Sequence, residues 1–193
     1  MSDYTVIKLV NEHLRQVLFD GMLGETAQFF SGLEAIHLGS PKETVEATTM
    51  SGKPVLSVFL YQVTEDPYMK NRPPVQVGTE QRMPPMALRF HYLITPVLSS
   101  PDGNALVLGK VLETMYDHPT LTITDPLSSQ AEDIRVVFET LSLGDLAEVW
   151  EALREPYRVS VAYQLRVPRL QSGRTQMAVP VGEAAGDYAG ATP

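Results

Sequence analysis

A dense run of strand-forming residues that leads directly into a proline-rich stretch constrains this chain more than any other feature. Residues 54–74 read PVLSVFLYQVTEDPYMKNRPP. Residues 55–64 alternate as in a β-strand and are apolar on both sides near the middle, which predicts that both faces of the strand are covered. Residues 66–85 contain five prolines. Because proline removes a hydrogen-bond donor and restricts the preceding residue, we expect a long loop without regular structure there.

Hydrophobic periodicity and capping residues predict the other elements of the fold. A first helix is expected to begin after Ser2 or Asp3, a second after Asp102 or Asn104, and a short third at Ser142. Strands are expected at residues 34–38, 44–49, 55–64, 86–98, 121–124, 134–141 and 158–167. In the strand at 55–64, one face is expected to carry Val55, Phe59, Tyr61 and Val63, and the other Leu56, Val58 and Leu60.

This order of elements predicts an α+β fold. It consists of one mixed, mostly antiparallel sheet with helices packed mainly on one face. The length of 193 residues suits one domain and is enough to bury about 70% of the unfolded surface. We expect residues 1–169 to form this domain. Residues 170–193, rich in Gly, Ala and small polar residues, are expected to form an extended or flexible C-terminal arm.

Composition excludes several classes of function. Lys and Arg total 15 against 23 Asp and Glu, a net charge of −8, which argues against nucleic acid or anionic lipid as a partner. The absence of cysteine excludes disulfides, thiolate metal sites and a cysteine nucleophile. No run approaches the roughly 18–20 apolar residues of a membrane helix, and Lys8, Glu12 and Arg15 argue against a secretory signal. We therefore expect a soluble protein without a membrane partner.

The sequence holds no motif for catalysis, phosphate binding or a cofactor. The four histidines, which lack metal-ligand spacing, are His13, His37, His91 and His118. Adjacent acids at 65–66 and 132–133 lie beside predicted turns, where solvated charge is the ordinary role. Trp150 has helical spacing from its apolar neighbours and is expected to anchor a core. We expect no enzyme activity, no cofactor and no metal.

Six segments follow one another in the order of a known family. They are YTVIKLVNEHLRQVLF at 4–19, LGSP at 38–41, LSVFLYQVTEDPYMKNRPP at 56–74, PMALRFHYLITP at 85–96, LGKVLETMYDHP at 108–119 and LAEVWEALREPYRVSVAYQLRVPRL at 146–170. In this order the chain resembles the tail-terminator, or cap, proteins of extracellular contractile injection systems. These are phage-tail-like particles related to the antifeeding prophage and virulence cassettes. The resemblance covers about residues 1–170.

The resemblance implies a structural role. Such caps form a homohexameric ring on the particle end distal to the baseplate. The ring binds the last layers of the inner-tube protein and the sheath protein, stops their polymerisation and anchors the sheath. The protein would then be cytoplasmic during assembly and afterwards part of a particle that is released or retained. The family supplies no catalytic residue to transfer.

We expect two segments to make the contacts: the loop at 66–85 and an arm at 170–181. Prolines reduce the entropy lost on docking, and unpaired strand edges favour strand addition to a sheath or a neighbouring cap sheet. An arm of 24 residues reaches roughly 80 Å when extended. The candidate interface residues are Tyr68, Met69, Lys70, Asn71, Arg72, Pro73, Pro74, Leu170, Gln171, Arg174, Met177, Val179 and Val181.

Three alternatives remain open from the sequence. An enzyme would need distant titrating groups that converge in a pocket. The second is an adaptor, stand-alone or associated with tube or sheath, or a domain that binds a small ligand. A stable monomer with no affinity for tube or sheath ends would indicate a stand-alone adaptor or a ligand-binding domain. A tube or sheath subunit would polymerise through matching head and tail surfaces, whereas a terminator stops at a closed ring.

Overall fold

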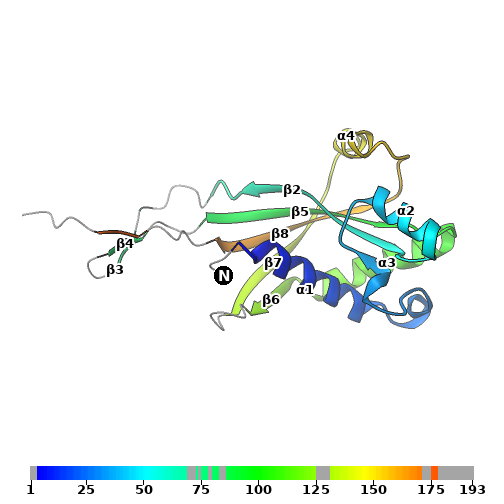
Figure 1. The fold of residues 1–193 in the computed structure, drawn as a ribbon, viewed down its shortest axis with the longest axis horizontal. Coiled ribbons are helices and arrows are strands. Elements are labelled where there is room, and N and C mark those ends of the chain that lie inside the picture. Colours follow the sequence, from blue (N-terminus) through cyan, green and yellow to red (C-terminus); the bar gives the residue numbers. More distant parts are fainter. Residues whose placement is uncertain are drawn as a thin grey trace, which may run out of the picture.

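A curled six-stranded sheet forms the centre of the fold (Figure 1). A computed structural model describes residues 4–68, 73, 75–77, 80–82, 86–124, 131–170 and 175–177. The strand order is β1-β2-β5-β8-β7-β6, and only the β1–β2 pair is parallel. The strands are β1 Ile36–His37, β2 Leu56–Glu65, β5 Met86–Pro96, β6 Thr120–Thr124, β7 Ala131–Glu139 and β8 Val161–Leu170. The predicted α+β fold with a mostly antiparallel sheet is confirmed.

Helices cover the two faces of this sheet unequally. They are α1 Val6–Gly21, α2 Pro41–Ser51, α3 Pro101–Asp117 and α4 Leu143–Leu153, with short 3₁₀ helices at Gly24–Phe29 and Leu33–Ala35. The main core joins α1 and α3 to one face, where Phe90, Tyr92 and Ile94 of β5 are fully buried. On the other face a smaller cluster joins Trp150 of α4 to Leu93 and Ala162. Both faces of the sheet centre are therefore covered, which was predicted only for the strand at 55–64.

The first helix buries one apolar stripe against the sheet. Its buried residues, each four apart, are Val6, Val10, Leu14 and Leu18. The helix ends at Gly21, as predicted, where it meets α3 closely. A Cβ atom on Gly21 would lie 2.3 Å from Oγ1 and 2.9 Å from Cβ of Thr114. The predicted caps Ser2 and Asp3 lie outside the described residues, and Thr5 occupies the N-cap position without a side-chain bond.

The strand predicted at 44–49 is wrong, because these residues belong to α2. The β-branched residues there favour a strand, but the capping signals around them favour a helix. Ser40 and Glu43 form a reciprocal capping box, and Pro41 occupies the first turn. Gly52 ends the helix at φ 73°, a left-handed conformation that glycine adopts without a steric penalty.

The prediction of no regular structure at 66–85 is also wrong. Two short strands, β3 Val75–Val77 and β4 Glu80–Arg82, form an antiparallel pair in this stretch. A third strand, β9 Thr175–Met177, pairs with β4 to complete a small second sheet. The five prolines restrict where strands form but leave these two segments free of proline.

The alternation of side chains between the two faces of the sheet is interrupted once along β2. Leu60 pairs with Tyr92 and Val63 with Phe90, with one irregularity between Leu60 and Gln62. Tyr92 and Phe90 point to the same face, so Val63 shares a face with Leu60, and the prediction that Val63 follows Phe59 and Tyr61 is wrong. A β-bulge adds one residue to one strand and thereby shifts its alternation.

The caps of the later helices differ in how well the sequence indicates them. Ser100, not Asp102 or Asn104, is the N-cap of α3 and accepts a hydrogen bond from the backbone N–H of Gly103. Asn104 instead bonds both backbone groups of Leu98, at 2.9 and 3.0 Å. The predicted start of α4 at Ser142 is confirmed, since Ser142 forms a capping box with Asp145.

Candidate protein interface

A buried ion pair fixes the point where the chain leaves the main sheet after β2. Asp66 Oδ1 accepts hydrogen bonds from Arg89 Nη2 at 2.9 Å and from the backbone N–H of Tyr68 at 3.0 Å. The backbone N–H of Asp66 also bonds the carbonyl of Ala87 at 2.8 Å. The hydrogen bond from Arg89 holds the pKa of Asp66 below its ordinary value. Because both charged side chains are largely shielded from solvent, this pair is stronger than a surface salt bridge.

The ion pair also presents an aromatic side chain to solvent. The ring of Tyr68 is 88% exposed, and the guanidinium of Arg89 lies 5.7 Å from the ring centroid. A cation over a ring face is an attractive contact that restricts the motion of the ring. Tyr68 is therefore an exposed aromatic residue whose ring is held by Arg89. Exposed aromatic residues of this kind commonly anchor protein interfaces.

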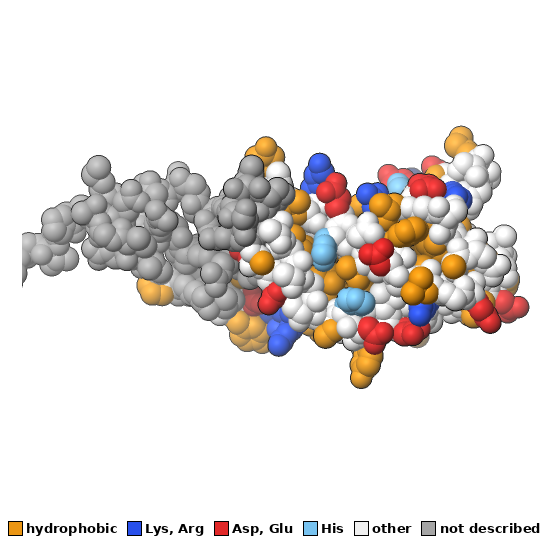
Figure 2. All heavy atoms as spheres, turned by 90° about the horizontal axis from the view of Figure 1, so that it is seen from below, with side chains coloured by type: hydrophobic (Ala, Val, Ile, Leu, Met, Phe, Trp, Pro, Cys, Tyr) orange, Lys and Arg blue, Asp and Glu red, His pale blue; other side chains and the backbone are white. Residues whose placement is uncertain are grey.

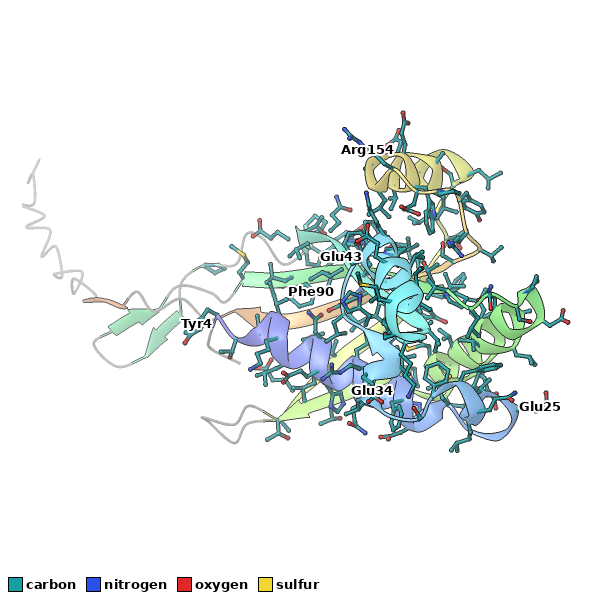
Figure 3. All side chains as sticks on the ribbon, turned by 45° about the vertical axis from the view of Figure 1, so that its right-hand side comes forward. Tyr4, Glu25, Glu34, Glu43, Phe90 and Arg154 are labelled. Atoms are coloured by element: carbon teal, nitrogen blue, oxygen red, sulfur yellow. The ribbon has the colours of Figure 1, made fainter. Side chains whose placement is uncertain are left out.

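The small sheet extends from the same end of the molecule (Figure 1). Its order is β3-β4-β9, with Val75 opposite Arg82 and Glu80 opposite Met177. Each outer strand therefore has one neighbour among the described residues, and none of these residues pairs with its other edge. In Figure 3, Tyr4 lies toward this sheet, while Glu25 and α3 lie at the opposite end.

The structure describes only some of the predicted interface residues. Tyr68 and Pro73 are exposed. The backbone of Leu170 ends β8 opposite Met86, and that of Met177 lies in β9. The structure thus brings the two predicted segments together, because β9 from the arm pairs with β4 from the loop. The remaining candidates lie outside the described residues: Met69, Lys70, Asn71, Arg72, Pro74, Gln171, Arg174, Val179 and Val181.

A polar cluster lies on the face of the sheet that also carries α4. His91 Nδ1 is 2.9 Å from Glu139 Oε2, and its Nε2 is 3.0 Å from Thr64 Oγ1. Glu139 on β7 reaches His91 on β5 across the intervening strand β8. The hydroxyl of Tyr61 donates to the same carboxylate at 3.3 Å. Burial and the adjacent carboxylate raise the pKa of Tyr61. The side chains of this cluster satisfy one another, so it is a structural network.

Trp150 and two of the histidines lie at or near helix positions that the structure describes. Trp150 is 2% exposed and anchors α4 on the sheet, as predicted. His118 Nδ1 lies 2.8 Å from the carbonyl of Thr114 at the end of α3. Partial burial lowers the pKa of His13 on α1. Among the residues that the structure describes, no cluster of three or more His, Asp or Glu side chains is arranged to hold a metal ion.

Sequence reasoning missed an apolar groove between α3 and the sheet. One part has a volume of about 510 Å³ and is lined by Pro96, Pro101, Asn104, Ala105, Leu108, Gly109, Leu112, Arg158 and Val159. A second part, of about 920 Å³, shares Leu112 and lies beside Tyr116 and Phe138. Val159 is 64% exposed and Tyr116 86%. Exposed apolar side chains that adjoin in this way are typical of interaction surfaces. Segments from three distant parts of the chain form the groove, so no local pattern indicates it.

Charged side chains on the face seen in Figure 2 fit the acidic composition. Acidic side chains are spread over this face, and the basic ones lie apart from one another. No helix in the described part of the chain has the length and apolar character needed to cross a bilayer.

Two solved structures share the fold. One is the sheath/tube terminator of an extracellular contractile injection system, PVC, in the extended state, with a TM-score of 0.64 and 19% identity over 100% of this chain and 65% of that chain. The other is the tube-terminating cap of the anti-feeding prophage, with a TM-score of 0.57 and 20% identity over 94% of this chain and 60% of that chain. The chain thus spans less than two thirds of the length of either structure. At these identities the likeness concerns the fold.

A comparison with curated proteins finds no match, whereas a comparison with protein families finds one. The profile of the Pvc16 N-terminal domain matches residues 9–183, which is most of the chain. Together with the two structures, this match confirms the resemblance indicated by the six ordered segments. The chain belongs to the Pvc16 N-terminal domain family.

Proposed function

We propose that this protein is a terminator of a contractile injection system, which ends the growth of the inner tube and of the sheath. The observation that carries this proposal is the likeness of the whole chain to a sheath/tube terminator. A second structure with this fold is a tube-terminating cap. The role is structural, so the protein binds tube and sheath and catalyses no reaction. It assembles in the cytoplasm and remains part of the finished particle.

The terminator acts as a homohexameric ring that anchors the distal sheath. A growing tube or sheath ends in a layer of subunits whose contact surfaces are unpaired. A ring that pairs those surfaces, and offers no copy of them on its far side, ends growth. The small sheet supports this mechanism, since β3 and β9 each have an outer edge with no described neighbour. Open strand edges bind an added strand through backbone hydrogen bonds.

The loop that begins at Asp66 supplies the side-chain contacts of the ring. Tyr68 is exposed and held by Arg89, and Lys70 and Arg72 follow it in the sequence. Reversing the charges with Lys70→Glu and Arg72→Glu is expected to weaken attachment to tube or neighbouring subunit. Lys42→Glu on α2 is the matched control for Lys70→Glu alone, because it reverses one lysine charge on a helix away from the loop. Unchanged capping by the loop variant would exclude the loop from the interface.

Particles made without this protein provide the test of the proposed function. We expect their tubes and sheaths to vary in length, as measured by negative-stain electron microscopy, and complementation with the full chain to restore a uniform length. Antibody labelling should place the protein at one apex of each intact particle. Label along the whole shaft would instead identify a tube or sheath subunit, and particles of normal length and contractility without the protein would refute the proposal.

A further inference from the structure

We propose that the groove beside α3 binds residues 178–183 of a second copy of this chain, so that exchanged C-terminal arms link neighbouring subunits. This inference rests on the proposed function, since it names a contact through which the ring closes. It differs from strand addition, because the arm segment beyond β9 enters a side-chain groove.

The groove suits a short apolar segment with an acidic end. Its walls come from prolines at the end of β5 and the start of α3, from aliphatic residues of α3, and from Val159. Arg158 lies at the same groove and forms no ion pair with any described residue. An apolar site with one cation that no described residue pairs with selects a ligand that carries a carboxylate next to apolar side chains.

The segment after β9 has this composition. Residues 178–183 read AVPVGE, so Val179, Pro180 and Val181 precede Glu183 by a few positions. Residues 178–193 contain Glu183 and Asp187 and no Lys or Arg. Proline and β-branched residues have little conformational freedom to lose on binding, which favours docking in a preset groove.

Residues 178–183 cannot reach the groove of their own chain. β9 pairs with β4, which precedes the Met86 end of β5, whereas the part of the groove that Val159 lines lies at the Pro96 end. β5 has 11 residues and is therefore about 37 Å long at about 3.4 Å per residue. Val181 follows Met177 by four residues, which span at most about 14 Å. Figures 1 and 3 both place the small sheet and α3 at opposite ends of the molecule.

Because the arm and the groove lie at opposite ends of the molecule, only one kind of assembly can form through them. Each copy offers an arm at one end and a groove at the other, which is a heterologous, head-to-tail contact. A heterologous contact makes a ring when the rotation between copies closes. The groove and arm thus supply a reason for ring formation that does not depend on the tube or the sheath.

The experiment uses the absence of native cysteine. Val159→Cys and Val181→Cys are produced as two separate chains in one strain that lacks the unmodified protein, and the purified particles are oxidised. We expect a disulfide-linked species of about twice 21.3 kDa on a non-reducing gel. Particles with Val159→Cys alone or Val181→Cys alone should show several-fold less of it. Pairing Val181→Cys with Met50→Cys sets the background, because Met50 is 91% exposed on α2, away from the groove.

A charge exchange then tests the acidic end of the arm. Arg158→Glu or Glu183→Arg alone is expected to lower the yield of the cross-linked dimer about five-fold, as an energy of about 1 kcal/mol implies. Both changes together should restore it. A yield no higher than the Met50→Cys background, in particles that retain the protein, overturns the inference and leaves the proposed function intact. Normal particles without the protein would instead refute the proposed function. Failure of the exchange to restore the yield excludes the Arg158–Glu183 contact.

Discussion

Replacing Gly21 by alanine tests how closely α1 and α3 pack. The added Cβ would lie 2.3 Å from Oγ1, 2.4 Å from Cγ2 and 2.9 Å from Cβ of Thr114. Rotation of Thr114 moves the first two atoms but not its Cβ, and the residue is only 3% exposed. The two helices must therefore move apart, and this movement disturbs the core that they share.

Two effects of opposite sign decide the magnitude. Overpacking a well-packed core costs about 1–3 kcal/mol. Alanine in place of glycine favours the folded state by up to about 1 kcal/mol, because the unfolded chain has fewer conformations and the helix is easier to form. At Gly21 the clash involves backbone-linked atoms and is the larger effect. We expect Gly21→Ala to lower the free energy of unfolding by about 1–2 kcal/mol.

Gly109→Ala is the matched control. Gly109 lies within α3, and apart from its chain neighbours and the backbone of its own helix no described atom lies within 4 Å of the position that its Cβ would take. The same change there should raise the free energy of unfolding by about 0.4–1 kcal/mol. Urea unfolding followed by circular dichroism measures both. Adding Thr114→Ala to Gly21→Ala should recover part of the loss in a double-mutant cycle. If both glycine variants shift stability in the same direction, the packing argument is wrong.

Three further predictions concern the other elements. Trp150→Ala should cost up to about 3–5 kcal/mol locally and speed hydrogen exchange in α4 more than in α1. Ser100→Ala should cost about 1 kcal/mol in urea unfolding, whereas Asp102→Ala should change it by less than about 0.5 kcal/mol, since only Ser100 caps α3. The lowered pKa of Asp66 stabilises the fold above the ordinary aspartate pKa of about 3.9, and this contribution is lost as the pH falls through the folded-state pKa. Asp66→Asn should therefore be less stable than the unmodified protein at pH 6, with the difference shrinking towards pH 2; a constant difference would contradict this assignment.

Elements with a strong period were predictable from the sequence. The stripe of α1 places buried residues at regular spacing, and the structure buries them as expected. Along β5 the alternation predicts a half-buried strand, which is wrong, because every residue from Phe90 to Pro96 is buried. The capping serine of α4 was equally clear, because its partner Asp145 follows three residues later.

Elements that depend on competing local signals were not predictable in the same way. In α2, the strand preference of Thr44 and Val45 opposed the capping box of Ser40, and the cap prevailed. β3 and β4 are three residues each, too short for a period to show. To predict the groove beside α3, one must know that Val159 and Leu108 line the same hollow, which only the tertiary fold establishes.

The central position of β8 has a mechanical consequence. This strand lies between β5 and β7, antiparallel to both, and its C-terminal end continues towards β9. A pull applied at β9 along the direction of β8 loads the hydrogen bonds of two ladders in shear, so that many must break together. The same force applied across a hairpin would open its bonds one after another. The C-terminal strand is thus joined to the body of the protein by a shear-resistant coupling, as the proposed anchoring of the sheath requires.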